Sequence, residues 1–329
     1  MGKRKAVACG NFGIPLSQIS IEASDYPPIL VIEFSSYQLE LVRNWKLNQS
    51  LFLNIAPDHL NRYKSFNHYF KTKQKIAKLI KSKKYYLVSQ QIKPSQKGII
   101  INNNLKQAKH FFWDQNNILY YHSSKHKAKI LCDIQDLNFG GAHNQTNLLF
   151  ALESIFLYLG KREFVAKLKY IRESLLQLKG LPHRFEIFYQ NNKVQFIDDS
   201  KATTSQAVVT AIKDLSSPTL LILGGQGKGE DFSTLAQQIY QKQIDVIVYG
   251  SEKDNLEKVL QKNQVSILAN IEKLDDSIQV IQQFIENKVD KNKKITVILS
   301  PGMTSWDQYP SFAHRGEAFQ EIILNLVKV

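Results

Sequence analysis

The sequence predicts an α/β protein with mostly parallel sheets, and three observations lead to this fold class. Strand-like apolar runs alternate with helical segments along much of the chain, which is the pattern of βαβ units. The runs at residues 30–36 and 51–55 are nearly unbroken in their apolar character, as in strands that are buried on both faces. Several runs end in acids, hydroxyls or glycines, and ligands bind at that edge of an open parallel sheet.

The first half of the chain begins with a strand-like run and a glycine-punctuated turn at residues 6–15. After the two buried strands, apolar residues at helical spacing predict a helix over residues 67–81. The next apolar runs are short and irregularly spaced, so we expect a small antiparallel patch beside the main sheet. They occupy residues 85–88, 98–101, 110–113, 118–121 and 128–131. A strongly apolar helix then ends near residue 159.

The second half is predicted to form a Rossmann-like parallel sheet. We expect a hairpin at residues 185–197, because two apolar runs flank a polar turn, and a helix at 205–213. Strands and helices then alternate to the C-terminus. The strands lie at residues 220–223, 245–249 and 295–299, and the helices at 254–262, 273–287 and 313–327. One boundary near residues 176–182 gives domains of residues 1–178 and 179–329.

Composition narrows the classes of function. The 43 Lys and Arg residues against 29 Asp and Glu give a formal charge of +14, which suggests a polyanionic partner. Because the lysines are scattered, a nucleotide explains the local basic residues as well as nucleic acid does, and we disfavour nucleic-acid binding. Cys9 and Cys132 lack the spacing of a metal site or a disulfide framework. With no membrane-length apolar stretch, we expect a cytoplasmic protein without membrane contact.

Polar side chains follow the two early strands at their carboxyl ends. Glu33, Asp58 and His59 lie there, and carboxylate oxygens with an imidazole can hold Mg²⁺ beside a nucleotide. For each residue taken alone, an ordinary role in a loop is the favoured interpretation. Asn144 and Asn147 lie three residues apart at the start of the apolar helix, where amides act as caps or contact an anionic or adenine-like ligand.

A third cluster, DDSKAT at residues 198–203, follows the second strand of the hairpin. Its acids, hydroxyl and amine suit a ligand site, although Asp and Ser are also common helix caps. A glycine-rich loop at 224–229 contains Lys228, which can meet an anion. This loop is not a P-loop, because Ile222 and Gly229 stand where that pattern requires Gly and Ser or Thr.

Together these clusters resemble the Mur ligases of peptidoglycan synthesis. The matching stretches appear in the family's order from residue 6 to the C-terminus. They are AVACGNFGIP, VIEFSSYQLE, LNIAPDHLNRY, GAHNQTN, GLPHRFE, DDSKATT, GGQGKGEDF and LSPGMTSWDQYPSFAHRGEAF. SSYQLE, DSKAT and the GGxGKG-DF pattern favour the branch that adds D-glutamate. The resemblance implies a truncated central ATPase domain followed by a C-terminal Rossmann-like domain.

The family's reaction uses ATP to convert a substrate carboxylate into an acyl phosphate, which an amino acid's amine then displaces to form an amide. Its Mg²⁺ offsets charge between two anions. By resemblance, Glu33 and His59 are metal ligands, and Lys73 falls where the family carries a carbamylated lysine. Carbamylation requires a deprotonated amine. Considered alone, Lys73 is better explained as a solvated helix lysine, so its assignment depends on the resemblance.

The resemblance assigns three further groups of residues. Nucleotide contacts fall on Asn144, Asn147, Arg184 and Asp199. Asn11 matches a contact to the UDP-sugar substrate, UDP-N-acetylmuramoyl-L-alanine. The site for incoming D-glutamate falls on Thr203, Lys228, Ser305 and Phe312. A cation and hydroxyl groups suit a dicarboxylic amino acid.

Two expectations follow from departures from the family pattern. Family members carry a UDP-binding domain of about 100 residues and then a phosphate loop, GTNGKS/T, upstream of the CGN motif, and neither occurs in this sequence. We therefore expect this chain alone to be inactive or incomplete as a ligase, and a separately encoded N-terminal piece to complete it. Two alternatives stay open: a related amide ligase of the folylpolyglutamate synthetase type, and a non-catalytic remnant or basic scaffold protein.

Overall fold

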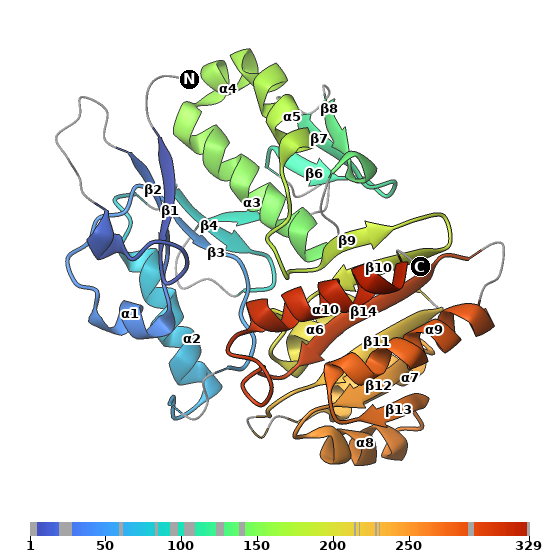
Figure 1. Cartoon of the computed structure of the whole chain (residues 1–329). Coiled ribbons are helices and arrows are strands. Elements are labelled where there is room, and N and C mark those ends of the chain that lie inside the picture. The colour runs from blue at the N-terminus through green and yellow to red at the C-terminus, as the bar shows by residue number, and fades with distance from the viewer. Residues whose placement is uncertain are drawn as a thin grey trace. The chain divides into compact units, whose positions relative to one another are not determined.

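The chain divides into two compact units in a computed structural model (Figure 1). One unit comprises Met1–Phe112 and Leu149–Phe164, and the other comprises Trp113–Leu148 and Val165–Val329. The boundary expected near residue 178 stays a prediction, because compactness alone does not define where a domain begins. The structure describes residues 5–19, 28–58, 62–82, 85–92, 98–101, 109–122, 128–137, 142–213, 215–216, 218–227, 229, 231–288 and 293–327.

The second unit is built on a six-stranded sheet of order β13-β12-β11-β14-β10-β9. Neighbouring strands are parallel, except that β9 pairs with β10 as the antiparallel partner of a hairpin. The strands are β9 (Glu186–Gln190), β10 (Val194–Asp198), β11 (Thr219–Gly224), β12 (Asp245–Tyr249), β13 (Ile267–Ile271) and β14 (Ile295–Gly302). β11 and β14 are buried along their whole length, which explains their unbroken apolar sequences.

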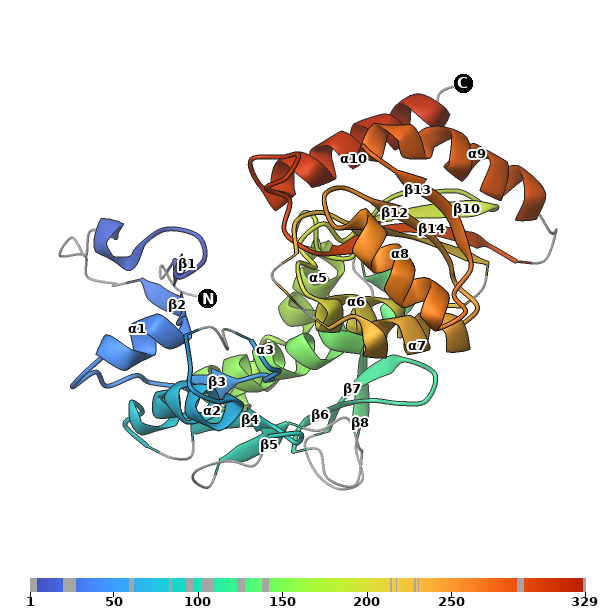
Figure 2. The same ribbon diagram turned by 90° about the horizontal axis from the view of Figure 1, so that it is seen from below.

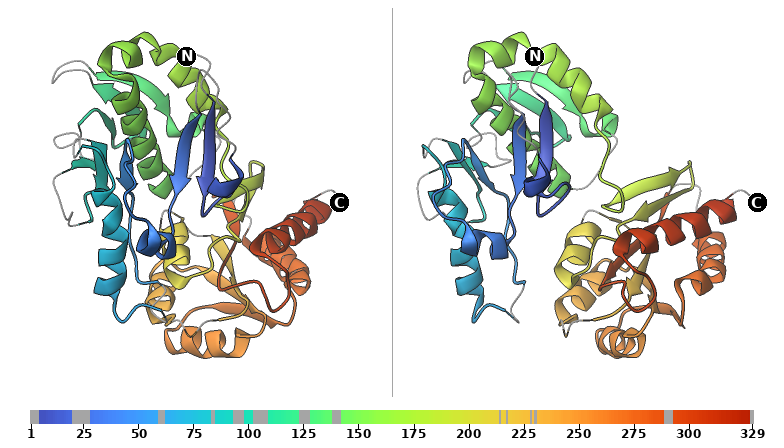
Figure 3. Two further views of the ribbon diagram at one scale, coloured as in Figure 1. Left: turned by 90° about the vertical axis from the view of Figure 1, so that its left-hand side faces the viewer. Right: turned by 60° about the vertical axis from the view of Figure 1, so that its left-hand side comes forward.

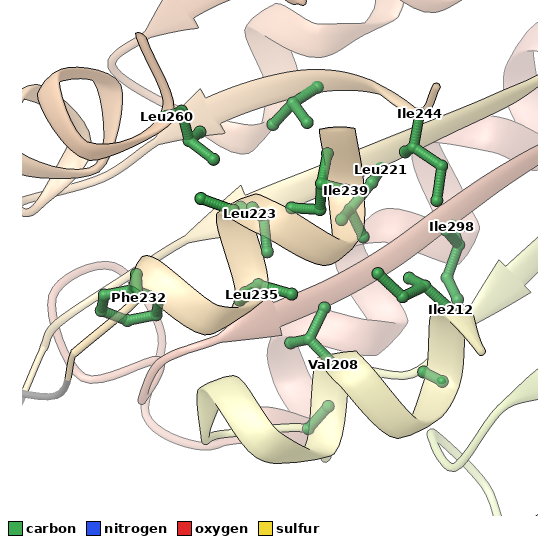
Figure 4. Packing of buried hydrophobic residues seen from close by; sticks show 14 of the residues in the cluster. Val208, Ile212, Leu221, Leu223, Phe232, Leu235, Ile239, Ile244, Leu260 and Ile298 are labelled. Atoms are coloured by element: carbon green, nitrogen blue, oxygen red, sulfur yellow. The ribbon is translucent and has the colours of Figure 1, made fainter. Parts of the chain in front are cut away.

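Helices cover both faces of this sheet, as Figure 2 shows. On one face lie α6 (Ser205–Ile212), α7 (Ser233–Gln241) and α8 (Lys253–Lys262), and on the other α9 (Ser277–Lys288) and α10 (Phe312–Val327). In Figure 4, side chains of α6 and α7 point toward β11 and β14. Full burial of each aliphatic side chain stabilises the fold by about 1.5–3 kcal/mol. The layers confirm the predicted Rossmann-like arrangement.

The order of the strands creates a switch point between β11 and β14. From β11 the chain winds outward to β12 and β13, and it then returns to β14 on the other side. Ligands bind outside the carboxyl ends of the strands at such a point. Gly224 lies there with φ 146°, and a Cβ at this position would overlap the carbonyl oxygen of Tyr249. The glycine-rich sequence therefore allows two backbones to approach closely.

A separate three-stranded sheet has two of its strands, β7 and β8, in the same unit. It has the order β6-β7-β8 and consists of β6 (Phe111–Trp113), β7 (Ile118–His122) and β8 (Ala128–Asp133), of which β7 and β8 are antiparallel. Only the last three apolar runs of the expected antiparallel patch are found here. Helix α5 (Leu168–Gln177) also belongs to this unit, as do the first residues of α3 (Ala142–Leu159).

The first unit contains two small parallel sheets. β1 (Ala6–Gly10) pairs with β2 (Ile29–Glu33), and the two blue strands lie side by side in Figure 3. The other sheet has the order β3-β4-β5, with β3 (Ser50–Phe52), β4 (Tyr86–Ser89) and β5 (Ile99–Ile101). Assigning β4 and β5 to an antiparallel patch was wrong, because β4 pairs parallel to β3 and β5 pairs parallel to β4. Apolar runs as short as these do not indicate which strand they pair with, or in which direction.

The first unit also contains helices α1 (Ser36–Leu41) and α2 (Phe66–Gln74), the larger part of α3, and most of α4 (Lys161–Ala166). The helix predicted at 67–81 is shorter than expected, since a 3₁₀ turn at Lys75–Lys78 replaces its last turns. This turn brings Ala77 into the core beside Phe52 and Tyr86. In the described part of the chain, no helix combines the length and apolar character that a membrane crossing requires.

Candidate functional site

The carboxyl ends of β1 and β2 hold the first polar cluster. Asn11 donates its backbone N–H to the carbonyl of Glu33 at 2.9 Å, and its Nδ2 donates to Glu33 Oε1 at 2.8 Å. Gly10, with φ 106°, makes this approach possible, because a Cβ there would overlap the Glu33 carbonyl oxygen. The backbone thus fixes Asn11 beside an exposed carboxylate.

Lys73 on α2 belongs to the same cluster. Burial lowers the pKa of its amine, and the carboxylates of Asp58 and Glu33 partly oppose this by raising it. Both carboxylates therefore lie within electrostatic reach of the Lys73 amine. The Nζ atom also lies 5.4 Å from the centroid of the Tyr69 ring, which leaves an apolar surface beside the amine. His59 lies outside the described residues.

The donor chemistry of this cluster fits Mg²⁺. Glu33 and Asp58 expose carboxylates, and such hard oxygen ligands suit that ion. A lysine amine with a lowered pKa also reacts with CO₂ more readily than an ordinary one, since the deprotonated form is the nucleophile. The cluster can therefore supply a mostly oxygen-based set of ligands.

Asn144 and Asn147 lie in the first turns of α3, as expected from their spacing. Asn147 is exposed and Asn144 is half-buried. Between them, Gln145 donates to the Asn117 side chain at 3.0 Å, and its carbonyl accepts from Trp113 Nε1 at 3.3 Å. These contacts tie the start of α3 to the end of β6 and to the turn that precedes β7.

Asp199 follows β10 at the edge of the large sheet and is buried. Its Oδ2 accepts from Ser300 Oγ at 2.7 Å and its Oδ1 from the Phe185 N–H at 3.1 Å. Burial raises the pKa of the Asp199 carboxyl to about 7, although both hydrogen bonds and the nearby Arg184 act in the opposite direction. Arg184 itself is exposed.

The residues that we expect to bind D-glutamate lie in or beside the loops at the switch point, as far as the structure describes them. Ser305 is buried and follows Thr304, which exchanges backbone hydrogen bonds with Gln226 of the glycine-rich loop. The carbonyl of Ala202, next to Thr203, accepts from the Gly302 N–H at 2.8 Å. These bonds join the loops that follow β10, β11 and β14.

Phe312 begins α10, and its ring lies 3.8 Å from Lys201 Nζ. This cation–π contact places a positive charge at the same edge. Lys228 lies outside the described residues. Glu33 and Asp199 belong to different units, so their expected convergence with His59 and Lys228 stays a prediction.

Sequence reasoning missed a buried pair behind this edge. His183 Nδ1 lies 2.7 Å from Asp198 Oδ2, and Glu186 approaches both residues closely enough for the three to resemble metal ligands. Gln320 Nε2, however, donates to Asp198 at 2.8 Å and to Glu186 at 3.2 Å. An amide donor therefore occupies the position that a cation would take, and the group is a hydrogen-bonded cluster.

Arg315 is the second missed residue and is fully buried. Its Nε donates to Ser200 Oγ, and one terminal nitrogen donates to the carbonyls of Ser200 and Met303, at 2.9–3.0 Å. No carboxylate among the described residues pairs with its guanidinium. The arginine thus ties the loop after β10 to the loop after β14. The consecutive Arg315-Gly316 in HRGEAF was the available signal.

Comparisons with known proteins agree with this description. Residues 14–155 match the Mur ligase middle domain, and residues 183–302 match the Mur ligase glutamate ligase domain. A UDP-N-acetylmuramoylalanine–D-glutamate ligase from Fusobacterium nucleatum is 33% identical over 98% of this chain and 72% of its own length. The corresponding ligase from Alkaliphilus metalliredigens is 27% identical over 96% of this chain and 68% of its own length.

A similar fold occurs in a Mycobacterium tuberculosis folylpolyglutamate synthase complexed with ADP and AMPPCP. The TM-score is 0.63 at 13% identity, and the match covers 90% of this chain and 69% of that one. This likeness shows the fold alone. Because both domain models match in order and the Fusobacterium relative aligns along nearly the whole sequence, the chain belongs to the Mur ligase family.

Proposed function

We propose that this chain forms the central and C-terminal parts of an ATP-dependent ligase that joins D-glutamate to UDP-N-acetylmuramoyl-L-alanine. The observation that carries this proposal is the 33% identity to a D-glutamate ligase over 98% of the chain. In this reaction the alanine carboxylate takes the γ-phosphoryl group of ATP, and the D-glutamate amine displaces phosphate. We place this step of cell-wall synthesis, and thus of cell division, in the cytoplasm.

The first cluster would hold Mg²⁺ through Glu33, His59 and a carbamylated Lys73. The ion offsets the repulsion between ATP and the substrate carboxylate. The lowered pKa of Lys73 supports carbamylation, because more of the amine is deprotonated at neutral pH. Asn11, hydrogen-bonded to Glu33, is positioned to contact the UDP-sugar substrate beside this centre.

A second group of residues, all in the unit that contains the six-stranded sheet, orients the nucleotide and the amino acid in this proposal. Asn144, Asn147, Arg184 and Asp199 contact the nucleotide in this proposal, since amides, a guanidinium and a carboxylate match base, phosphate and ribose groups. By resemblance, D-glutamate binds through Thr203, Lys228, Ser305 and Phe312. Support comes from the hydrogen bonds that join their loops at the switch point.

We further propose that these 329 residues do not turn over alone. The phosphate loop, which supplies a lysine for the β- and γ-phosphates and a hydroxyl for Mg²⁺, does not occur in this sequence. In this proposal, a segment that carries the UDP-binding domain and this loop completes the site. The β1–β2 pair supports such an addition, because Val31 is 61% exposed on a parallel sheet of the kind that is normally buried on both faces.

Phosphate release tests this proposal. The chain is incubated with ATP, UDP-N-acetylmuramoyl-L-alanine and D-glutamate, with and without a fragment that contains the UDP-binding domain and the GTNGKS/T loop. We expect release only with the fragment. Robust turnover by this chain alone would refute the need for the missing loop. No phosphate release in either arm would favour a non-catalytic remnant.

A further inference from the structure

The turn that presents Arg184 has an unusual backbone. His183 and Phe185 flank it with φ values of 60° and 47°, and both lie in the left-handed region that side chains other than glycine rarely adopt. Each such residue costs on the order of 1 kcal/mol or more. Such a conformation persists only where surrounding contacts hold it.

The side chain of His183 provides the central contact. It is buried, and its Nδ1 donates to Asp198 Oδ2, which is fully buried, at 2.7 Å. Asp198 is fixed in turn, since its Oδ1 accepts from the Ser200 N–H at 2.9 Å. The histidine ring is thereby attached to the end of β10.

The backbone of the same turn is held at three points. The His183 N–H donates to Glu186 Oε2 at 2.9 Å, and its carbonyl accepts from the Lys201 N–H at 3.0 Å. The Phe185 N–H donates to Asp199 Oδ1 at 3.1 Å. The turn is thus held by its backbone, whereas the Arg184 side chain is exposed.

Helix α10 closes the arrangement from the other side. Gln320 donates to Asp198 and Glu186 and so holds both acceptors in place. Gly316 has no positive φ, but a Cβ there would overlap His183 Nδ1 and would lie 2.6 Å from Asp198 Oδ2. The glycine is thus required for space and not for backbone conformation.

We propose that His183 is a positioning residue, which acts through its bond to Asp198 to hold Arg184 in the orientation that binds the nucleotide. The two adjacent acids then have separate tasks. Asp198 locks the turn from behind, whereas Asp199 stands at the edge between the Phe185 N–H and Ser300 Oγ. This inference rests on the proposed nucleotide site.

The test has a ligand-free arm. Amide hydrogen exchange of Phe185 and Lys201 is measured in the full chain for His183→Ala, Gly316→Ala and the control Glu317→Ala. Glu317 is the exposed neighbour of Gly316 on the same helix. We expect exchange to rise at least tenfold in the first two variants and to stay unchanged in the control. Unchanged exchange in His183→Ala would show that the His183–Asp198 hydrogen bond does not hold the turn.

The second arm measures the dissociation constant for Mg-ADP, with the complementing N-terminal fragment present. We expect Arg184→Ala and His183→Ala each to weaken binding about tenfold, as for loss of a hydrogen bond to a charged group. The double variant should be no weaker than either single variant, because His183 acts through Arg184. Additive losses would overturn the positioning role.

The two arms separate the proposals. If the wild-type protein does not bind Mg-ADP, the proposed function fails, while the exchange arm still decides whether His183 holds the turn. If Mg-ADP binds and His183→Ala binds it as well as the wild type does, the positioning inference fails and the proposed function stands. Gly316→Ala guards against an effect of the lost imidazole itself, since it separates the same pair without changing either partner.

Discussion

Replacing Asp199 by Asn should change how the stability of the sheet-bearing unit depends on pH. Burial is the main reason that the pKa of this carboxyl is raised, to about 7 from 3.8. Between these two values the folded state holds a proton that the unfolded state has lost. The free energy of unfolding therefore falls as pH rises through this range, by about 1.4 kcal/mol per pH unit.

The sign follows from the direction of the shift. The contribution of Asp199 to stability is fully present below pH 3.8, is lost as pH rises toward 7, and changes no further above that. The whole change amounts to about 4 kcal/mol, of which about 3 kcal/mol falls between pH 5 and pH 8. Asn cannot titrate, so Asp199→Asn should gain that much stability relative to the wild type over this interval.

Native-state hydrogen exchange of the buried β14 amides measures this free energy for the unit that contains Asp199. Asp231→Asn is the matched control. Hydrogen bonds from Ser233 lower the pKa of the exposed Asp231, so this carboxyl changes the pH dependence of stability only below about pH 4. We expect the control to follow the wild type between pH 5 and pH 8. A constant difference between Asp199→Asn and the wild type would mean that Asp199 stays ionised in the folded protein.

Three further predictions concern packing and the first cluster. Phe319→Ala, at a fully buried position, should cost about 3–5 kcal/mol in urea unfolding, and a loss below 1 kcal/mol would contradict the packing described. Gly224→Ala should destabilise the protein far more than Gly160→Ala, because a Cβ at Gly224 overlaps the backbone of Tyr249. Gly160 has φ 75° and open space around it, so its replacement should cost about 1 kcal/mol. Urea unfolding compares the two variants. ¹³C-bicarbonate should give a carbamate NMR signal in the wild type that Lys73→Arg lacks, and an equal signal in both would place the modification elsewhere.

The strands were predictable because their apolar runs are nearly unbroken, but their partners were not. The apolar runs at residues 86–89 and 99–101 are as short as those of the antiparallel strands. Only three-dimensional contacts show that β4 pairs parallel to β3 and that β5 pairs parallel to β4. Helix α7 escaped prediction because its buried Leu235, Ala236 and Ile239 are diluted by glutamines.

The candidate site divides in the same way. Asp199 lies at a strand end that the sequence marks by itself, so its position could be predicted. His183 and Asp198 are 15 residues apart, and Gln320 lies 122 residues beyond Asp198. A bond that forms only when α10 packs on the sheet leaves no periodic signal. The fully buried Arg315 escaped for the same reason, since a charged residue on a helix normally predicts an exposed face.

Amino-acid selectivity tests the central claim most directly. Complemented with the N-terminal fragment, the chain is given ATP and UDP-N-acetylmuramoyl-L-alanine together with D-glutamate, L-glutamate or L-lysine, and the amide product is identified by mass spectrometry. The account predicts a product with D-glutamate and none with the other two. Equal use of L-glutamate, or addition of L-glutamate to a folate in place of the nucleotide-linked acceptor, would contradict it.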